Sequence, residues 1–380
     1  MKRLGLIVVL TVYIVSAIFA AQYKIIIKNT SKFDRCSEMV EANICNINGE
    51  GFKYVLKDLK GEEVPYQYIF NNKNEATSII FQVNVKAKSS ASFLLTEGKP
   101  SIVKSKTFGR FVPERRDDFA WENDICAYRM YGPALANENP SNGVDLWLKR
   151  TEDLVINQRY HDEIINGLSY HVDHGNGLDC YSVGHTMGAG GIAPFYLDSL
   201  WIGNHYDHYK VIENGPLRTV FMLTYDSVKV GNNYLKQEIT ITTTAGSLLN
   251  KAEVKYTGNL EKIKLATGIF LHDSKGKLNV ELKNGTLGYA ENAFIGDNIS
   301  MGRNYVGVYV PSKVNSIVQR GQHIFALGNY KLKDRYVYYF GGGWSKWKFA
   351  TDDDWFDALK NFAKATKEPL KLKISYIKKN

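Results

Sequence analysis

The sequence has only four cysteines among its 380 residues, and it contains no Cys-x-x-Cys pair. A structural zinc ribbon needs such pairs and is therefore excluded. An even number of cysteines allows two disulfides in an oxidising compartment, with three alternative pairings. We expect Cys36–Cys45, which closes a short loop. Four free thiols are the alternative, because a chain of this size can fold without covalent cross-links.

Other familiar motifs are also absent. There is no His-Glu-x-x-His sequence, as in metalloproteases, and no Gly-x-Ser-x-Gly elbow, as in serine hydrolases. The lysines and arginines form no dense block, so the formal net charge of +9 does not indicate nucleic-acid binding. This modest positive charge is compatible with an anionic ligand.

A long apolar run occurs only at the N-terminus. Met1-Lys2-Arg3 precedes an apolar stretch from Leu4 to Phe19, and small residues follow at Ala20-Ala21. This pattern predicts a cleavable signal peptide over residues 1–21. A membrane anchor is the alternative, but the run is shorter than the ~20 residues of a typical span. No cysteine follows it to carry a lipid. We expect a soluble mature protein in the periplasm or secreted, with a net charge of +7 once Lys2 and Arg3 are removed.

Strand patterns dominate the mature chain. Residues 23–28, 78–85 and 90–95 alternate between apolar and polar side chains, with Asn-, Lys- and Gly-rich loops between them. Residues 22–100 are therefore predicted to form a small N-terminal β-sandwich module. The boundary is expected within residues 97–106, and residues 101–380 are predicted to form the catalytic domain.

The second region contains a regular series of alternating segments. They cover residues 217–225, 234–244, 250–256, 263–271, 305–310, 323–327 and 336–340. So many strands at short spacing, without helices between them, predict an all-β fold built on a large antiparallel β-sandwich. One helix is expected after Thr351, with Trp355, Phe356 and Leu359 on its apolar face, and a strand at 370–377 follows it.

The middle third has a different composition. Six of the eight histidines lie between His161 and His208, beside several tyrosines and glycines. Glycine-rich backbone with such polar side chains is typical of loops that contact a ligand. Packing residues and salt-bridged surface turns are the alternative interpretation. Candidate substrate-binding residues here are Arg115, Arg116, Trp121, Glu122, Asn123, Arg159, His174, His205 and Tyr206.

Metal binding remains an alternative for this segment. His171, His174, Cys180 and His185, or His205 with His208, are suitable zinc ligands by type, but their spacing matches no established motif. The sequence requires no cofactor, and a bound divalent metal stays open.

The abundance of His, Tyr and Arg favours removal of a proton next to a carboxylate. Hydrolysis of a glycoside needs two paired carboxylates, and no spacing in the sequence selects such a pair. Proton removal instead needs a cation near the carboxylate, a base and an acid. The cation could be Arg115, Arg159 or Arg218, the base His171 or His185, and the acid Tyr160 or Tyr181. We take as candidate catalytic residues His171, His185, Tyr181, Tyr160 and Arg218.

Four blocks carry a resemblance to a known family. They are residues 113–124 (PERRDDFAWEND), 128–135 (YRMYGPAL), 170–181 (YHVDHGNGLDCY) and 215–221 (GPLRTVF). They resemble a domain-of-unknown-function family encoded in polysaccharide-utilisation loci of Bacteroidota, over nearly all of the mature chain. That family includes an oligosaccharide dehydratase of ulvan degradation. The second half is also similar to the supersandwich of galactose mutarotase and several polysaccharide lyases.

The resemblance implies a carbon–oxygen lyase. Such an enzyme eliminates water, or a 4-linked sugar, from a non-reducing-end uronic acid and leaves a 4,5-unsaturated uronate. Its partner would be an anionic oligosaccharide. A non-catalytic carbohydrate-binding protein, with Trp121, Tyr206, Trp344 and Trp347 stacking on sugars, is one alternative. A mutarotase-like or glycoside-hydrolase activity is another. The polysaccharide, the stereochemistry of elimination and the oligomeric state stay open.

Overall fold

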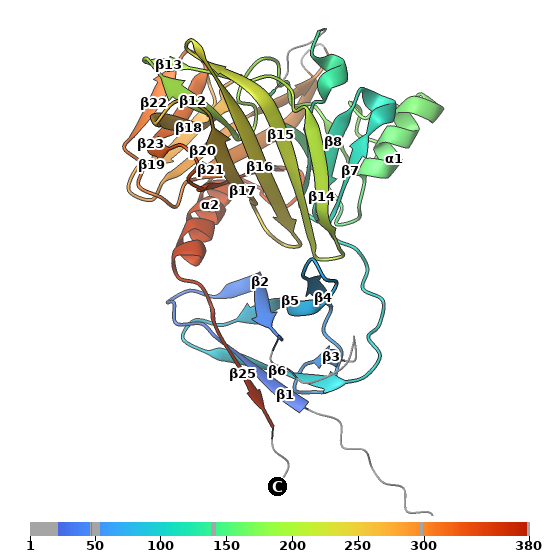
Figure 1. The fold of residues 1–380 in the computed structure, drawn as a ribbon. Helices are drawn as coiled ribbons and strands as arrows, with labels where there is room; N and C mark the ends of the chain where they lie inside the picture. Colours follow the sequence, from blue (N-terminus) through green and yellow to red (C-terminus); the bar gives the residue numbers. More distant parts are fainter. Residues whose placement is uncertain (1–21, 46, 48–53, 138–141, 297–298, 378–380) are drawn as a thin grey trace, which may run out of the picture.

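The computed structural model describes residues 22–45, 47, 54–137, 142–296 and 299–377 (Figure 1). The predicted signal peptide, residues 1–21, lies outside this part of the chain. Within the described ranges, no helix is both long and apolar enough to cross a bilayer. All named strand pairs are antiparallel, and the predicted all-β fold with a C-terminal helix is confirmed.

The N-terminal module consists of two sheets packed face to face. One has the order β25-β1-β6-β3, with β25 at Lys371–Tyr376, β1 at Gln22–Lys28, β6 at Ser90–Glu97 and β3 at Tyr54–Lys57. The other has the order β2-β5-β4, with bounds Arg35–Asn43, Ala76–Val85 and Tyr66–Phe70. Buried side chains such as Ile25, Phe81 and Leu95 form the core between them.

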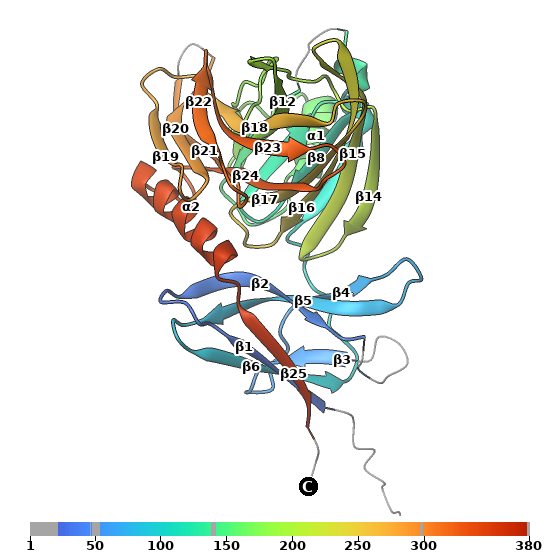
Figure 2. The same ribbon diagram turned by 60° about the vertical axis from the view of Figure 1, so that its left-hand side comes forward.

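The C-terminal strand completes this module. Ile374 of β25 lies opposite Ile25 of β1, and Figure 2 shows the red strand crossing the face of the blue module. The domain boundary predicted near residue 100 assigns these C-terminal residues to the second region. Pairing between strands from the two ends of the chain leaves no local sequence signal. A boundary drawn at residue 100 therefore cannot assign β25 to the N-terminal module.

The expected disulfide Cys36–Cys45 does not form, and all four cysteines are free. Cys36 lies near the start of β2, and Cys45 lies just beyond its end. An extended strand rises about 3.3 Å per residue, so the two are far beyond the ~7 Å that a disulfide can bridge between Cα atoms. A strand in place of the expected loop explains the error.

The second region contains an eight-stranded sheet and a five-stranded sheet that share one core. The eight-stranded sheet has the order β14-β15-β16-β17-β24-β21-β20-β19. Its bounds are His208–Asn214, Arg218–Val230, Asn233–Thr244, Asn250–Thr257, Tyr336–Trp344, Ile299–Tyr309, Thr286–Ile295 and Lys277–Glu281. The five-stranded sheet has the order β13-β12-β18-β23-β22, at Ser199–Leu200, Gly191–Tyr196, Lys262–Phe270, His323–Lys331 and Ser316–Arg320.

Helix α2, Asp352–Lys367, covers part of the large sheet (Figure 2). Thr351 and Asp354 form a reciprocal capping box at its start, which satisfies two backbone N–H groups. Trp355, Phe356 and Leu359 on its apolar face pack against Tyr305 and Ala290. The aromatic residues are therefore core, as the predicted amphipathic pattern indicates.

A further five-stranded sheet positions most of the candidate site. Its order is β11-β10-β9-β8-β7, with bounds Gly177–Asp179, Asp145–Lys149, Cys126–Met130, Asp118–Glu122 and Phe108–Val112. The short helices η1 (Pro113–Arg115), η2 (Pro133–Leu135), α1 (Ile156–His161) and η3 (Asp162–Asn166) connect or flank these strands. Every residue of β8, β9 and β10 is buried. Strands buried on both faces lack alternation, so the sequence prediction of loops was wrong here.

Candidate active site

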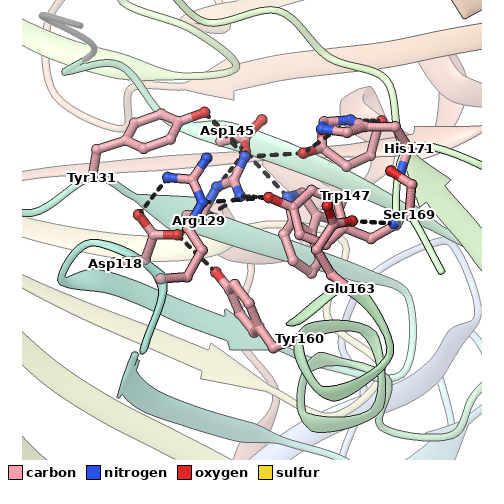
Figure 3. Close-up of polar contacts among 12 residues, drawn as sticks. Asp118, Arg129, Tyr131, Asp145, Trp147, Tyr160, Glu163, Ser169 and His171 are labelled. Carbon is pink, nitrogen blue, oxygen red and sulfur yellow. Dashed lines mark hydrogen bonds and ion pairs between the residues drawn. The ribbon is translucent and has the colours of Figure 1, made fainter. Parts of the chain in front are cut away.

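The guanidinium of Arg129 lies at the centre of a buried ion cluster (Figure 3). Its Nε is 2.8 Å from Oδ2 of Asp145, which lies directly opposite on β10. Its Nη2 is 2.9 Å from Oδ2 of Asp179 on β11, and its Nη1 is 3.7 Å from Oδ2 of Asp118 on β8. Four neighbouring strands thus place three carboxylates around one arginine.

Aromatic rings enclose the same guanidinium. The ring centroids of Tyr131, Trp147 and Tyr170 lie 4.8, 5.0 and 5.6 Å from its central carbon. The hydroxyls of Tyr131 and Tyr170 are 3.1 and 3.2 Å from its Nη atoms. Burial alone would lower the pKa of Arg129, but Asp145, Tyr131 and Asp179 raise it well above its ordinary value. Arg129 is therefore a fixed cation.

The cluster contains more carboxylates than cations. Burial raises the pKa of Asp118 to about 6, although Arg129 and Arg115 act in the opposite direction. Burial and the charge of Asp145 also raise the pKa of Asp179. Arg115, whose side chain is 26% exposed, lies 3.3 Å from Asp118 and completes the group at the surface. The cluster can therefore take up a proton near neutral pH.

The raised pKa of Asp118 predicts a pH-dependent stability. A carboxyl with a pKa of about 6 when folded and about 3.9 when unfolded contributes stability below pH 4 and loses it as the pH rises through 6. Asp118→Asn carries no such charge. Between pH 4 and 7.5 the wild type should lose on the order of 2–3 kcal/mol relative to Asp118→Asn, measured by urea unfolding. A difference between the two that is independent of pH would contradict this assignment.

His171 borders the cluster and exposes one ring nitrogen. Its Nδ1 lies 2.8 Å from the carbonyl oxygen of Asp179, and its ring packs on Tyr170 with centroids 4.7 Å apart. A carbonyl oxygen only accepts hydrogen bonds, so Nδ1 carries the hydrogen and the neutral ring has its lone pair on Nε2. The side chain is 57% exposed. His171 is therefore suited to act as a base toward a bound molecule.

Tyr181 has the opposite chemical character. Its hydroxyl is buried and has no hydrogen-bond partner among the described residues. Burial, Glu291 and Asp145 raise the pKa of Tyr181 well above its ordinary value, so the hydroxyl keeps its proton. A buried, protonated and unpaired hydroxyl is suited to donate a proton to a ligand atom.

His272 and Glu291 support Tyr181, and the sequence analysis missed both. The His272 ring lies edge-on to Tyr181 with centroids 4.7 Å apart. Its Nδ1 is 2.9 Å from Oε1 of Glu291, and its Nε2 is 2.5 Å from the carbonyl oxygen of Ser182. Burial lowers the pKa of His272, but Glu291 and Ser182 raise it above its ordinary value overall. These residues lie outside the histidine-rich segment, and no motif marks them.

Three residues of the predicted sugar subsite are structural. Trp121 has no exposed surface and donates from Nε1 to Oδ1 of Asn250, so it cannot stack on a sugar. Glu122 forms a buried ion pair with Lys149 at 2.7 Å and accepts the backbone N–H groups of Val155 and Ile156 at the start of α1. Asn123 donates to the carbonyl oxygens of Thr244 and Ser247.

Four other candidates are also held by the protein itself. The Tyr160 hydroxyl donates to Oδ2 of Asp118 at 3.1 Å, and this hydrogen bond, which Tyr181 lacks among the described residues, argues against Tyr160 as the acid. Arg159 is buried and donates to the carbonyl oxygens of Leu148 and Asn176. Tyr206 is buried and donates to the carbonyl oxygen of Asp117, and its neighbour His205 is buried as well.

The remaining candidates, which lie outside the Arg129 cluster or at its edge, are Arg218, Arg116, His174 and His185. Arg218 pairs with Glu213 and with Glu41 of the N-terminal module, both at 2.9 Å, so it joins the two regions and does not fit the role of neutralising cation. Arg116 is exposed in a left-handed turn. His174 is exposed, with Nε2 3.0 Å from the Ser169 carbonyl. His185 is exposed, and it adds to the lowering of the pKa of His323 that burial mainly causes.

The proposed zinc ligands are not brought together. In the described ranges, no group of three His, Cys, Asp or Glu side chains is placed to hold a metal ion. His171 and Cys180, for example, contact Asp179 and Asn304 respectively.

The chain belongs to a family described as a domain of unknown function, DUF4861, whose model matches residues 27–372. An uncharacterized protein P7 of Formosa agariphila is 29% identical over 373 residues, which cover 92% of this chain and 93% of that protein. The match to the family model establishes the family, and neither comparison names an activity.

Two crystal structures from Enterococcus faecalis share the fold. One is a protein in glycosyl hydrolase family 38, with a TM-score of 0.50, 8% identity and coverage of 94% of this chain and 47% of that one. The other is an alpha-mannosidase, with a TM-score of 0.51, 9% identity and coverage of 93% and 46%. The chain spans about half the length of each, and at such low identity the likeness describes the fold alone.

Proposed function

We propose that the protein catalyses β-elimination at a non-reducing-end uronic acid of an anionic oligosaccharide. Water leaves from C4, whose hydroxyl is free at the non-reducing end, and the product is a 4,5-unsaturated uronate. The observation that carries this proposal is the exposed side chain of His171, which the Asp179 carbonyl holds at the Arg129 cluster, together with the protonated hydroxyl of Tyr181, two residues beyond Asp179, which has no partner among the described residues. The resemblance of the sequence blocks to a domain-of-unknown-function family that includes an ulvan oligosaccharide dehydratase supports the same chemistry.

Each step of the elimination has a suitable group. Nε2 of His171 accepts the proton from C5, and the C–H electron pair forms the C4=C5 double bond. The C4–O bond breaks, and Tyr181 donates its proton to the leaving oxygen. Arg115, half-buried at the edge of the cluster, neutralises the substrate carboxylate while negative charge develops on it. Proton return from His171 to Tyr181 through solvent restores the enzyme.

The fixed cluster has a supporting role in this scheme. Arg129 uses its donors on Asp145, Asp179, Tyr131 and Tyr170, so it orients these side chains and does not itself bind substrate. Asp179 also holds His171 through its backbone carbonyl. We place the reaction in the periplasm or outside the cell, in keeping with the predicted signal peptide.

Product mass tests the proposal. The purified protein is incubated with saturated, uronate-terminated oligosaccharides from ulvan, glycosaminoglycans and pectin, and products are followed by mass and ultraviolet absorbance. Dehydration removes one water and creates an absorbing conjugated double bond. Hydrolysis adds one water, and simple binding or mutarotation leaves the mass unchanged. A gain of one water or an unchanged mass, without a double bond, would reject elimination.

A further inference from the structure

A surface hollow lies on the sheet β13-β12-β18-β23-β22, and no residue of the strands that carry the Arg129 cluster lines it. Its volume is about 850 Å³, within the range of small-molecule sites. Its lining includes Phe195, Tyr196, Leu197 and three lysines, Lys262, Lys264 and Lys331. We refer to it as the lysine hollow.

The three lysines share one exposed face without counter-ions. Lys262 of β18 lies directly opposite Lys331 of β23, and Lys264 lies two residues further along β18, opposite Asn329. Within the described part of the chain, none of the three has an ion pair or a hydrogen bond from its ammonium group. Like charges opposite each other across strands are destabilising. The arrangement therefore costs free energy unless an anion relieves it.

The charge balance of the hollow stays positive. Two aspartates also line it, but Asp198 is 3.4 Å from Arg320 and is already paired. Asp334 is the other carboxylate of the lining, against three lysines. The lysine Cα atoms cover a patch of about 5 Å between strands and about 7 Å along the strand. A ligand that satisfies all three needs more than one negative group.

An exposed, strained hairpin forms one edge of the hollow. Leu197 and Asp198 both adopt left-handed backbone conformations, with φ of +52° and +55°. This conformation is unfavourable for a bulky residue. Burial offsets little of its free-energy cost at Leu197, because this residue is 73% exposed. Tyr196 lies next to it, and Phe195 forms a buried floor. The hollow thus combines an apolar edge with a cationic face.

We propose that the lysine hollow is a second carbohydrate-binding site that takes a multiply anionic oligosaccharide segment. Sulfate or carboxylate groups on successive sugars would contact Lys262, Lys264 and Lys331, and the face of a sugar ring would pack on Leu197 and Tyr196. That the hollow binds an anion rests on its own residues. That the anion is an oligosaccharide rests on the proposed function.

Calorimetry with a fixed probe tests the proposal. The probe is a lyase-generated heparin tetrasaccharide, whose terminal uronate is already unsaturated and cannot undergo the elimination again. The site variant is Lys262→Gln/Lys264→Gln/Lys331→Gln. The control is Lys210→Gln/Lys255→Gln/Lys283→Gln, which removes the same charge from three exposed lysines elsewhere. We expect about tenfold weaker binding for the site variant and less than about twofold for the control.

No binding by the wild-type protein, or equal losses in the two triple variants, would overturn the anion site. Equally tight binding of linear polyphosphate of matched charge would overturn its assignment to an oligosaccharide. Uncharged maltotetraose should not bind measurably, and equal binding of it would also reject the proposal. Because the assay measures binding without turnover, it separates this site from the proposed elimination. Binding of the tetrasaccharide by a protein that shows no elimination activity would reject only the proposed elimination.

Discussion

Tyr181→Phe is expected to lower the elimination rate by about 10²- to 10⁴-fold, the usual contribution of a general acid or base. The substitution removes one hydroxyl that has no hydrogen-bond partner in the described structure. Removing an unsatisfied buried polar group does not weaken the fold, so the free energy of unfolding should stay the same or rise slightly. Rate and stability are measured on the same preparation, by product absorbance and urea unfolding.

Tyr160→Phe is the matched control for this substitution. It removes the same atom from another buried tyrosine, but that hydroxyl donates to Asp118. A hydrogen bond to a charged group contributes about 1.5–3 kcal/mol, so this variant should lose stability. It should keep far more activity than Tyr181→Phe. Full activity in Tyr181→Phe would exclude this hydroxyl as the acid.

Arg129→Met is expected to lower the free energy of unfolding by about 3–5 kcal/mol at neutral pH. It leaves Asp145 and Asp179 buried without their cation, and breaking one side of a buried ion pair has a cost of this size. Arg115→Met is the control. Its side chain is partly exposed, so it should cost less than about 1 kcal/mol while activity falls.

A double substitution sharpens this prediction. Arg129→Met/Asp145→Asn removes both members of the closest pair, so it should be more stable than Arg129→Met alone. Two results would show that Arg129 does not stabilise the cluster. One is a loss of less than about 1 kcal/mol in the free energy of unfolding of Arg129→Met, and the other is a double variant that is less stable than Arg129→Met alone. Urea unfolding of the four proteins in this cycle is the measurement.

The sequence could predict those parts of the fold that bury one face. In β16 the burial alternates along most of the strand, and the corresponding pattern at 234–244 predicted it. Helix α2 was predicted because its capping box and apolar stripe lie within one continuous segment. β25 was predicted as a strand, but its partner β1 lies at the other end of the chain.

The candidate site could be predicted only in part. The histidine-rich segment led to His171 and Tyr181, because composition alone is unusual there. Arg129 and Asp145 were not chosen, since β9 and β10 were interpreted as loops and only strand register places the two opposite each other. A usable signal did exist, because each is a charged residue beside apolar side chains in a short segment. His272 and Glu291 meet through tertiary packing alone.

His171→Gln tests the assignment of the base. We expect a loss of rate similar to that of Tyr181→Phe, because glutamine cannot accept the C5 proton. His208→Gln is the control, since His208 is exposed on β14 and pairs with Asp226. Comparable losses in both variants would show that the effect is not specific to the Arg129 cluster.

The central claim is that His171 and Tyr181 carry out elimination at a uronic acid. It is tested most directly by the product mass of wild type and Tyr181→Phe on one saturated, uronate-terminated oligosaccharide. The account predicts a wild-type product lighter by one water that absorbs in the ultraviolet, and almost none of it from Tyr181→Phe. An unchanged mass, a gain of one water, or the same yield from both proteins would contradict it.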